Sequence, residues 1–395
     1  MTKEEKNVYH IKLLNKISSI GTDVFDKEKY TYSEAEENPD AILVRSASLH
    51  EMEFGKNLKC IARAGAGVNN IPVEKCSEKG IVVFNTPGAN ANAVKELTMA
   101  ALLLASRKIT EGIAWVNSLK GQCDDVAKEV EKGKSAFLGP ELYGKKLGVI
   151  GLGAIGAMVA NTAYHFGMEV MGFDPYMTID NAWSLSRAIK KAQSREEIYA
   201  QCDYITIHVP STPETKGMIC ESTIHQMKDG VRIVNLARGD LVINKDVIAA
   251  VGQGKIGAYV TDFPCEELLG IPGIVTIPHL GATTPESEDN CALMAVKECM
   301  AFLEQGNIKN SVNYPEVILP HTGNFRLCIF HKNIPSMLSQ VSSVVSDMKI
   351  NIENMINKSK KDNAYTIIET NDEITESAIE KIRSIQGIVR VNLIQ

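Results

Sequence analysis

A short glycine-rich turn between an apolar strand and a helix constrains the fold of this chain more than any other feature. The turn is Gly151–Gly156 (GLGAIG), which matches the pattern G-x-G-x-x-G. It directly follows the apolar run Lys146–Ile150, and a helical pattern over Ala157–Phe166 comes after it. This order of strand, tight turn and helix is typical of a parallel, doubly wound α/β sheet. The glycines let the backbone approach a pyrophosphate, and the free N–H groups at the start of the helix attract its charge.

An acidic residue stands where such a turn needs one. Asp174 closes the next apolar strand, Glu169–Phe173, and a carboxylate there can accept hydrogen bonds from an adenosine ribose. Pro175 and Tyr176 follow it instead of an arginine, so we predict NAD rather than NADP as the cofactor. A glycine turn that serves packing alone is the alternative. The strand, the helix and the acid together favour a cofactor site.

Apolar runs alternate with helical patterns over most of the chain, which predicts parallel sheets with helices on their faces. Beyond the two strands already named, the expected strands are Ala41–Val44, Cys60–Ala64, Ile81–Phe84, Tyr204–Val209, Arg232–Leu236, Ala258–Thr261 and Ile274–Ile277. The segment Asn92–Ile109 is apolar on nearly all sides and predicts a buried helix. The polar, charged segment Gly121–Ser135 predicts a surface connection.

The pattern changes after a helix expected at Glu288–Glu304. Residues 307–320 contain two prolines and little periodicity, which predicts a linker or a docking strand. From Gly323 the chain reads strand, helix, strand, strand, helix, strand, which is the ferredoxin-like arrangement.

Composition and charge exclude several classes of protein. The chain has 395 residues, enough for two or three domains, and a formal net charge of −6, which argues against a broad nucleic-acid interface. It has no apolar run of transmembrane length and no apolar stretch near its start that would suggest a signal peptide. Nine cysteines without a CxxC pair predict free thiols in a reducing, cytoplasmic compartment. The histidines show no ligand spacing, so we expect no metal.

Three polar segments follow the late strands, where an open α/β sheet places its site. They are NLARG (Asn235–Gly239), TDFPCEE (Thr261–Glu267) and PHLGATT (Pro278–Thr284). An arginine can hold a carboxylate in a planar fork, a histidine can exchange a hydroxyl proton, and a carboxylate can orient that histidine. Arg238, His279 and Glu267 are available for these roles. Each residue alone is more often an ordinary loop or surface residue, and only the set, after a nucleotide motif, favours catalysis.

Together with VRSAS (Val44–Ser48), ARAGAGVNNI (Ala62–Ile71) and NTPGANANAVKEL (Asn85–Leu97), these segments resemble the D-2-hydroxyacid dehydrogenase family over nearly the whole chain. With SVNYPEV (Ser311–Val317) and the C-terminal pattern, the chain is most similar to the phosphoglycerate dehydrogenase branch of that family. The resemblance implies a flavodoxin-like substrate domain of residues 1–92 with 290–315. It also implies a Rossmann-type NAD domain of residues 93–289 and a regulatory ACT domain of residues 323–395. The site would lie in a cleft between the first two domains.

The resemblance also implies roles for individual residues. The catalytic trio falls on Arg238, Glu267 and His279, although TDFPCEEL departs from the family pattern and leaves the choice between Glu266 and Glu267 open. Contacts to NAD fall on Ala66, Gly151, Gly153, Ala154, Ile155, Gly156, Asp174, Val209, Leu236, Ala237, Arg238, Asp262, His279, Leu280, Gly281 and Ala282. Contacts to the substrate fall on Arg45, Ser46, Gly67, Val68, Asn90 and Arg238, with Arg45 facing a phosphate.

In the ACT domain the resemblance places an effector amino acid, L-serine, on His331, Asn333 and Asn351. Ser336 stands where the family usually has glycine, so a domain that only holds subunits together is the alternative. The family is usually a homodimer or a larger homo-oligomer.

The expected activity is oxidation of D-3-phosphoglycerate with NAD, the first committed step toward serine. Two alternatives stay open: a dehydrogenase of another D-2-hydroxy acid, such as glycerate or 2-hydroxyglutarate, and a non-enzymatic protein that senses NAD. A reactive thiol at Cys265 is a further possibility, although a passive cysteine is more common.

Overall fold

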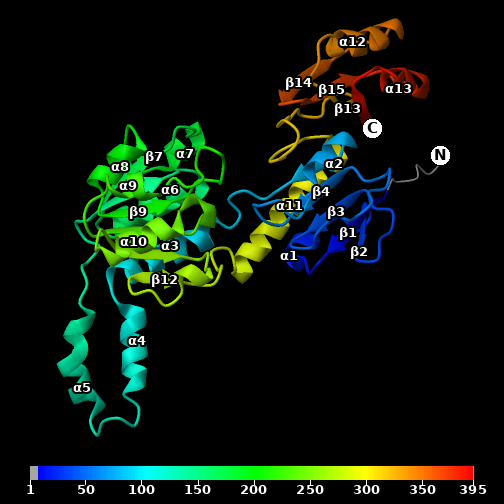
Figure 1. Cartoon of the computed structure of the whole chain (residues 1–395). Helices are drawn as coiled ribbons and strands as arrows, with labels where there is room; N and C mark the ends of the chain where they lie inside the picture. Colours follow the sequence, from blue (N-terminus) through cyan, green and yellow to red (C-terminus); the bar gives the residue numbers. More distant parts are fainter. Residues whose placement is uncertain (1–7, 395) are drawn as a thin grey trace. The chain divides into compact units, whose positions relative to one another are not determined.

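The computed structural model describes residues 8–394. They form two compact units, one from the residues up to Asn90 together with those from Glu288 onward, and the other from Ala91–Ser287 (Figure 1). The first unit contains two of the three sheets, and the second unit contains the third. The α/β fold class with a small C-terminal antiparallel sheet is confirmed.

The second unit is built on a seven-stranded parallel sheet in the order β12-β11-β10-β9-β6-β7-β8. The chain leaves β6 to one side through β7 and then crosses to the other side at β9, so the turn after β6 lies at the topological switch point. The strands are β6 (Lys146–Ile150), β7 (Glu169–Phe173), β8 (Lys190–Lys191), β9 (Tyr204–Ile207), β10 (Val231–Asn235), β11 (Ile256–Thr261) and β12 (Ile274–Thr276). All except the short β8 were expected from the sequence.

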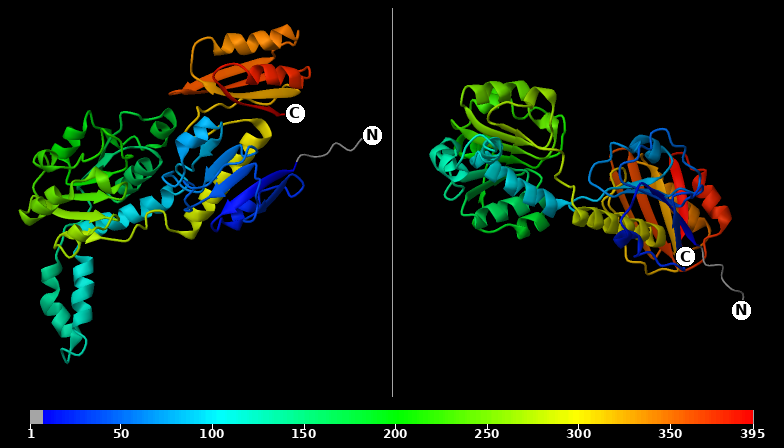
Figure 2. Two further views of the ribbon diagram at one scale, coloured as in Figure 1. Left: turned by 45° about the vertical axis from the view of Figure 1, so that its right-hand side comes forward. Right: turned by 90° about the horizontal axis from the view of Figure 1, so that it is seen from below.

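Helices cover both faces of this sheet because alternate strand residues point to opposite sides (Figure 2). On β10, Ile233 packs with the cluster that contains α8, α9 and α10, while Val234 packs with the cluster that contains α3 and α6. The helices are α3 (Ala91–Ser106), α6 (Ala154–His165), α7 (Ile179–Ser184), α8 (Arg195–Gln201), α9 (Glu221–Ile224) and α10 (Asn244–Gly252), with 3₁₀ turns η2 (Gly239–Leu241) and η3 (Glu266–Leu268).

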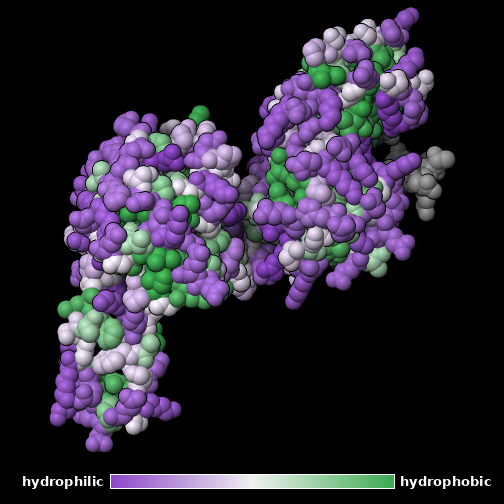
Figure 3. Space-filling view, in the orientation of Figure 1, coloured by the Kyte–Doolittle hydropathy of each residue, from purple (hydrophilic) through white to green (hydrophobic). Residues whose placement is uncertain are grey.

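The connection expected at Gly121–Ser135 lies at the surface, and it contains a helix that was not predicted. The chain forms a helical hairpin of α4 (Ile109–Ser118) and α5 (Val126–Gly133), followed by the 3₁₀ turn η1 (Lys134–Phe137). The Asp125 carboxylate caps α5 by accepting a hydrogen bond from Lys128 N at 3.0 Å. The Trp115 ring packs on Phe137 with a centroid distance of 5.2 Å. Figure 3 shows hydrophobic side chains on the surface of this hairpin, which has no buried residue in either helix.

The first unit contains a five-stranded parallel sheet in the order β2-β1-β3-β4-β5. The expected strands are confirmed as β3 (Ala41–Val44), β4 (Cys60–Arg63) and β5 (Val82–Phe84). The sequence analysis missed β1 (Tyr9–Leu14), in which only Ile11 is fully buried, and the edge strand β2 (Tyr30–Ser33). The helices of this part are α1 (Ser19–Thr22), α2 (Val73–Glu78) and α11 (Pro285–Gln305), which begins at the boundary between the units.

The C-terminal pattern forms a four-stranded antiparallel sheet in the order β14-β15-β13-β16, as a ferredoxin-like fold requires. Its elements are β13 (Phe325–Lys332), α12 (Met337–Asp347), β14 (Asn354–Lys360), β15 (Asn363–Thr370), α13 (Glu376–Arg383) and β16 (Ile388–Ile394).

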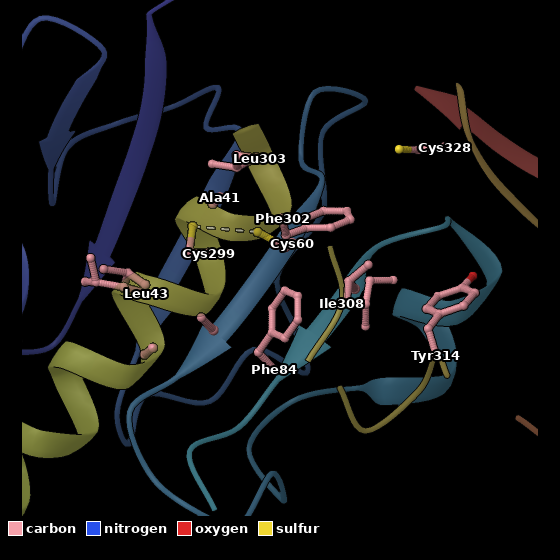
Figure 4. Packing of buried hydrophobic residues seen from close by; sticks show 14 of the residues in the cluster. Ala41, Leu43, Cys60, Phe84, Cys299, Phe302, Leu303, Ile308, Tyr314 and Cys328 are labelled. Carbon is pink, nitrogen blue, oxygen red and sulfur yellow. Dashed lines mark hydrogen bonds between the residues drawn. The ribbon is translucent and has the colours of Figure 1, made fainter. Parts of the chain in front are cut away.

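The two sheets of the first unit share one hydrophobic core. Phe84 of β5, Phe302 of α11 and Cys328 of β13 belong to one buried cluster (Figure 4). Phe330 of β13 and Tyr365 of β15 belong to the same cluster. The Arg390 guanidinium of β16 reinforces this contact by donating to the carbonyls of Leu58 and Lys56. Residues 307–320 run between the sheets, and Ile308 pairs with Val317 while Ser311 pairs with Phe84, which confirms a docking strand.

Candidate active site

The three glycines of the turn after β6 are needed for three different reasons. Gly151 has a φ of +92°, and a Cβ there would meet the His208 carbonyl oxygen at 2.5 Å. A Cβ on Gly156 would overlap the Gly151 carbonyl oxygen. A Cβ on Gly153 would meet nothing within 4 Å, and no side chain caps the helix that begins there. Gly153 therefore leaves open space in front of the first turn of α6, where Ala154 and Ile155 lie.

Asp174 ties the end of β7 to this turn. Its carboxylate oxygens accept hydrogen bonds from Leu152 N and Tyr176 N, each at 2.8 Å. Each carboxylate oxygen has a second lone pair, so Asp174, which is half-buried, can still accept hydrogen bonds from ribose hydroxyls. The open space at Gly153, the uncapped helix start and the Asp174 carboxylate together fit a dinucleotide such as NAD.

The three expected catalytic residues follow three adjacent strands. Asn235 at the end of β10 pairs with Thr261 of β11, which pairs with Thr276 of β12, so the strands end at one edge of the sheet. Arg238 lies three residues beyond β10, Glu267 is in η3 after β11, and His279 follows β12. All three side chains are exposed, as residues that meet a ligand must be before it binds.

Asp262 links two of these residues. It directly follows β11 and is fully buried, one oxygen accepts a hydrogen bond from Gly281 N at 3.3 Å, and the other has no partner among the residues the structure describes. Burial raises the pKa of Asp262, and the positive charges of His279 and Arg238 oppose this shift. Arg238, Asp262 and His279 thus follow three adjacent strands that end at one edge of the sheet.

Glu267 is not joined to His279 by a hydrogen bond within residues 8–394, and neither is Glu266. The His279 ring instead packs on Phe263 with a centroid distance of 5.0 Å. The choice between the two glutamates, and the role of Glu267 as the partner of His279, stay predictions. The Cys265 thiol, directly before the two glutamates, accepts a hydrogen bond from Asn244 Nδ2 at 3.2 Å.

The sequence analysis missed two positioning side chains. The buried Asn235 amide donates to the Arg238 carbonyl at 2.8 Å and accepts from Ala237 N at 3.2 Å, so it holds the NLARG turn. Phe263 supports His279, as described above. A buried asparagine at the end of an apolar strand was the available signal for the first, and nothing in the local pattern distinguishes the second.

A second histidine near the turn has a different character. His208 follows β9, and its Nε2 lies 3.0 Å from Thr206 Oγ1. Burial lowers the pKa of His208 to about 4, so this ring is neutral at physiological pH. The exposed His279 is therefore the better proton acceptor for a ligand at this edge.

The remaining cofactor residues of the second unit lie around the same strand ends. Val209, Ala237 and Ala282 are half-buried, Leu236 and Gly281 are buried, and Leu280 is exposed.

The residues expected to hold the substrate lie in the first unit. Arg45 follows β3, and its guanidinium forms an ion pair with the Glu288 carboxylate at 2.5 Å. Ser46 N donates to Asn15 Oδ1 at 2.9 Å. Ala66, Gly67 and Val68 follow β4, and Asn90 ends this part of the unit. Ala66 is exposed, and its carbonyl accepts a hydrogen bond from Asn85 Nδ2 at 2.6 Å.

The expected effector residues do not share one environment. His331 is only 3% exposed, and its ring nitrogens lie 2.8 Å from the Lys332 carbonyl and 2.9 Å from Thr366 Oγ1. Asn333 and Asn351 are exposed, and their amides donate to Lys361 O and Glu353 Oε1. An effector that contacts His331 would therefore have to displace a hydrogen bond inside the sheet.

Two kinds of feature are absent from residues 8–394. No helix in that range combines the length and the apolar character needed to cross a lipid bilayer. The same range has no group of three or more His, Cys, Asp or Glu side chains placed to hold a metal ion.

Comparison with known proteins places this chain among dehydrogenases. Residues 99–281 match the family model described as "D-isomer specific 2-hydroxyacid dehydrogenase, NAD binding domain". The D-3-phosphoglycerate dehydrogenase of Methanocaldococcus jannaschii is 36% identical over 322 residues, which cover 79% of this chain and 58% of that protein. The enzyme of the same name from Haemophilus influenzae is 30% identical over 343 residues, which cover 83% of this chain and 79% of the relative.

Solved structures give the same fold. An NAD⁺-bound 3-phosphoglycerate dehydrogenase from Entamoeba histolytica superposes with a TM-score of 0.60 at 25% identity, covering 78% of this chain and 99% of that one. A D-lactate dehydrogenase from Treponema pallidum has a TM-score of 0.64 at 21% identity, covering 77% of this chain and 99% of the other, and this likeness concerns the fold alone.

The chain spans little more than half the length of several curated relatives it matches, between 52% and 60% for those of Methanocaldococcus jannaschii, Bacillus subtilis and Archaeoglobus fulgidus. It spans 79% of the Haemophilus influenzae enzyme at 30% identity. The chain belongs to the family of D-isomer specific 2-hydroxyacid dehydrogenases.

Proposed function

We propose that this protein oxidises D-3-phosphoglycerate to 3-phosphohydroxypyruvate with NAD. The observation that carries the proposal is that Arg238, Asp262 and His279 follow three adjacent strands that end at one edge of the sheet, with Asp262 buried there. This group lies in the unit that also contains the glycine turn. The named relatives support the choice of substrate.

The glycine turn and its surroundings would hold the cofactor. The backbone from Gly151 to Gly156 would face the pyrophosphate, Asp174 the adenosine ribose, and Asp262 the nicotinamide end. Bound NAD supplies the acceptor for the hydride that leaves C2 of the substrate.

Arg238 and His279 would act on the hydroxy acid itself. The Arg238 guanidinium pairs with the substrate carboxylate and stabilises negative charge on the oxygen that becomes the carbonyl. Nε2 or Nδ1 of His279 takes the hydroxyl proton as the hydride departs, so the proton and the electron pair leave separately. Glu267 then stabilises the imidazolium.

Arg45 would receive the phosphate. Its ion pair with Glu288 is the observation that keeps a second function open, because a phosphate has to compete with this carboxylate. If Glu288 retains Arg45, the chain would prefer an unphosphorylated D-2-hydroxy acid, such as glycerate or 2-hydroxyglutarate.

The experiment is NADH absorbance with D-3-phosphoglycerate and NAD, and in reverse with 3-phosphohydroxypyruvate and NADH. D-glycerate and D-2-hydroxyglutarate are the comparison substrates. Turnover that depends on the phosphate and falls in Arg45→Met supports the proposal. Turnover of glycerate alone would move the assignment to the second function, and binding of NAD without any turnover would favour a sensor of NAD.

We further infer a homo-oligomer, a cytoplasmic location and regulation by L-serine. The exposed apolar residues Ile109, Ile113 and Val116 of α4, with Val126 of α5, support a partner subunit. Serine at this site would have to compete with the hydrogen bond between the His331 ring and Thr366 inside the sheet. Light scattering tests the assembly. Initial rates with and without L-serine test the regulation, and an unchanged rate would leave the C-terminal domain a structural role.

A further inference from the structure

A carboxyl group of α11 is buried without a full set of partners. Glu298 is 7% exposed, and its Oε1 accepts a hydrogen bond from Asn310 Nδ2 at 2.6 Å. Its Oε2 is enclosed and has no hydrogen-bond partner within residues 8–394. The proposed reaction does not use this group. A buried polar atom without a partner is costly, so its position calls for a functional explanation.

Asn310 connects Glu298 to the loop that follows β4. Its backbone is held in the left-handed region with a φ of +56°, and its carbonyl accepts a hydrogen bond from Asn85 N at 3.4 Å. The Asn85 side chain in turn donates to the Ala66 carbonyl at 2.6 Å. Three successive hydrogen bonds therefore run from the Glu298 carboxyl group to Ala66.

The neighbouring backbone reinforces this connection. Val312 N donates to the Val83 carbonyl at 2.9 Å, and Ser311 pairs with Phe84, so the segment after α11 lies along the end of β5. Thr86 N donates to the Gly65 carbonyl at 3.1 Å. A shift of Asn310 would thus move the end of β5 and the loop that hydrogen-bonds to it.

We propose that Glu298 is a positioning residue that fixes the Ala66 carbonyl through Asn310 and Asn85, and so sets the backbone of residues 66–68 for the substrate carboxylate. This inference rests on the proposed function, because only a hydroxy-acid substrate gives that loop a carboxylate to bind. Glu298 lies in the first unit and Arg238 and His279 in the second, so the expected effect is on substrate binding and not on hydride transfer.

Protonation of Glu298 supports this role. Burial raises the pKa of Glu298 to about 8, while the Asn310 amide and the Lys309 ammonium oppose the shift. The other nearby cation on a facing element, Lys360 of β14, donates to the Ser311 carbonyl at 2.8 Å. At neutral pH the carboxyl group is therefore mostly protonated. An ionised Glu298 would be a buried charge with one hydrogen-bond donor, so ionisation destabilises the packed position of this side chain.

The test compares Glu298→Ala with Glu298→Gln, which keeps the acceptor oxygen but cannot ionise. Glu304→Gln is the matched control, because Glu304 is on the same helix and its carboxylate accepts from the Tyr30 hydroxyl at 2.6 Å. In Glu298→Ala the KM for D-3-phosphoglycerate should rise about two- to tenfold, with kcat changed less than about twofold. The KM of the unaltered protein should rise above about pH 8, and that of Glu298→Gln should not.

Hydrogen–deuterium exchange without substrate gives a readout that does not depend on turnover. Residues 64–68 and 85–86 should exchange faster in Glu298→Ala, and at the unaltered rate in Glu298→Gln and Glu304→Gln. Unaltered exchange and KM in Glu298→Ala would overturn the inference, as would an alkaline rise of KM that persists in Glu298→Gln. Absence of turnover in every variant, with the expected exchange pattern, would instead refute the proposed substrate and leave the positioning role standing.

Discussion

His279 is the single residue on which the proposed chemistry depends most. Replacing it by asparagine keeps the side chain polar but removes the group that takes the hydroxyl proton. We expect His279→Asn to lower kcat by about 10²–10⁴, with the affinity for NAD changed little. Steady-state NADH absorbance measures the first quantity and calorimetric titration with NAD the second. His225→Asn, at an exposed histidine that follows α9, should leave both unchanged. A normal kcat in His279→Asn would remove it from the mechanism.

A buried ion pair joins the start of the C-terminal domain to the segment before it. The Arg326 guanidinium donates to the Glu369 carboxylate at 2.5 Å and to the carbonyls of Gln305 and Leu319, and both charged side chains are fully buried. Arg326→Met would leave Glu369 as an uncompensated buried charge, and we expect it to lower the free energy of unfolding by about 3–5 kcal/mol.

Urea unfolding measures this loss. The double variant Arg326→Met with Glu369→Leu should recover most of it, because no charge is then left unpaired. Lys134→Ala, which breaks the exposed pair with Glu131, should cost less than about 1 kcal/mol. Equal losses for the buried and the exposed pair would contradict the expected energetic difference.

The Arg326–Glu369 pair also predicts how the free energy of unfolding depends on pH. Burial alone would raise the pKa of Glu369, but the hydrogen bonds from Arg326 and Thr322 outweigh it and lower the pKa to about 2. The folded state therefore binds this proton less readily than the unfolded state. Ionised Glu369 therefore adds about 3 kcal/mol to the free energy of unfolding above about pH 4.5, and this contribution is lost as the pH falls toward 2. Urea titrations from pH 6 to 2 should show this loss in the unaltered protein and not in the double variant.

At the scale of single elements, two glycines of the turn after β6 should matter for different properties. Gly153 should affect NAD binding, and Gly156 should affect folding. A Cβ at Gly153 meets nothing, so Gly153→Ala should leave the unfolding temperature nearly unchanged while it weakens NAD binding by obstructing the approach of the pyrophosphate. A Cβ at Gly156 overlaps the Gly151 carbonyl, so Gly156→Ala should destabilise the second unit itself. Thermal unfolding and NAD titration of both variants measure the two effects, and normal NAD binding in Gly153→Ala would argue against a pyrophosphate there.

The backbone of Ser336, the residue before α12, is in a strained conformation. Ser336 precedes the helix with a φ of +67°, a region that costs an ordinary residue about 1–2 kcal/mol and glycine nothing. We expect Ser336→Gly to stabilise the C-terminal domain by about 0.5–1 kcal/mol after the larger entropy of unfolded glycine is subtracted. Ser339→Gly, inside the same helix, should instead destabilise by about 0.5–1 kcal/mol. Chemical denaturation of both variants checks the opposite signs.

At the scale of the whole molecule, the C-terminal domain completes the core of the first unit. Phe330 and Tyr365 are buried against residues of β5 and α11, so a chain that ends at residue 322 would expose that apolar surface. We expect the truncated protein to bind a hydrophobic dye and to unfold at a lower temperature than the full chain. An unchanged unfolding temperature of the first unit would show that the shared core contributes little.

Most elements could be predicted because their signals are local. The strands from β3 to β16, apart from β8 and β14, are runs rich in apolar residues and bounded by turns, and GLGAIG opens its helix within six residues. The hairpin of α4 and α5 was not predicted, because its helices are short and their apolar residues lie at the surface and not in a core. The strands β1 and β2 were missed because few of their side chains are buried.

The roles of Arg238, Glu267 and His279 stay predictions. The sequence by itself determined the class of fold, the order of most of its elements and the glycine turn with Asp174. These depend on periodicity and spacing along the chain. Only the tertiary structure decided that the C-terminal sheet shares a core with the first sheet, that Glu288 pairs with Arg45, and that Glu298 is enclosed beside Asn310. Such contacts join residues far apart in sequence or depend on burial, and burial is a property of the packed molecule.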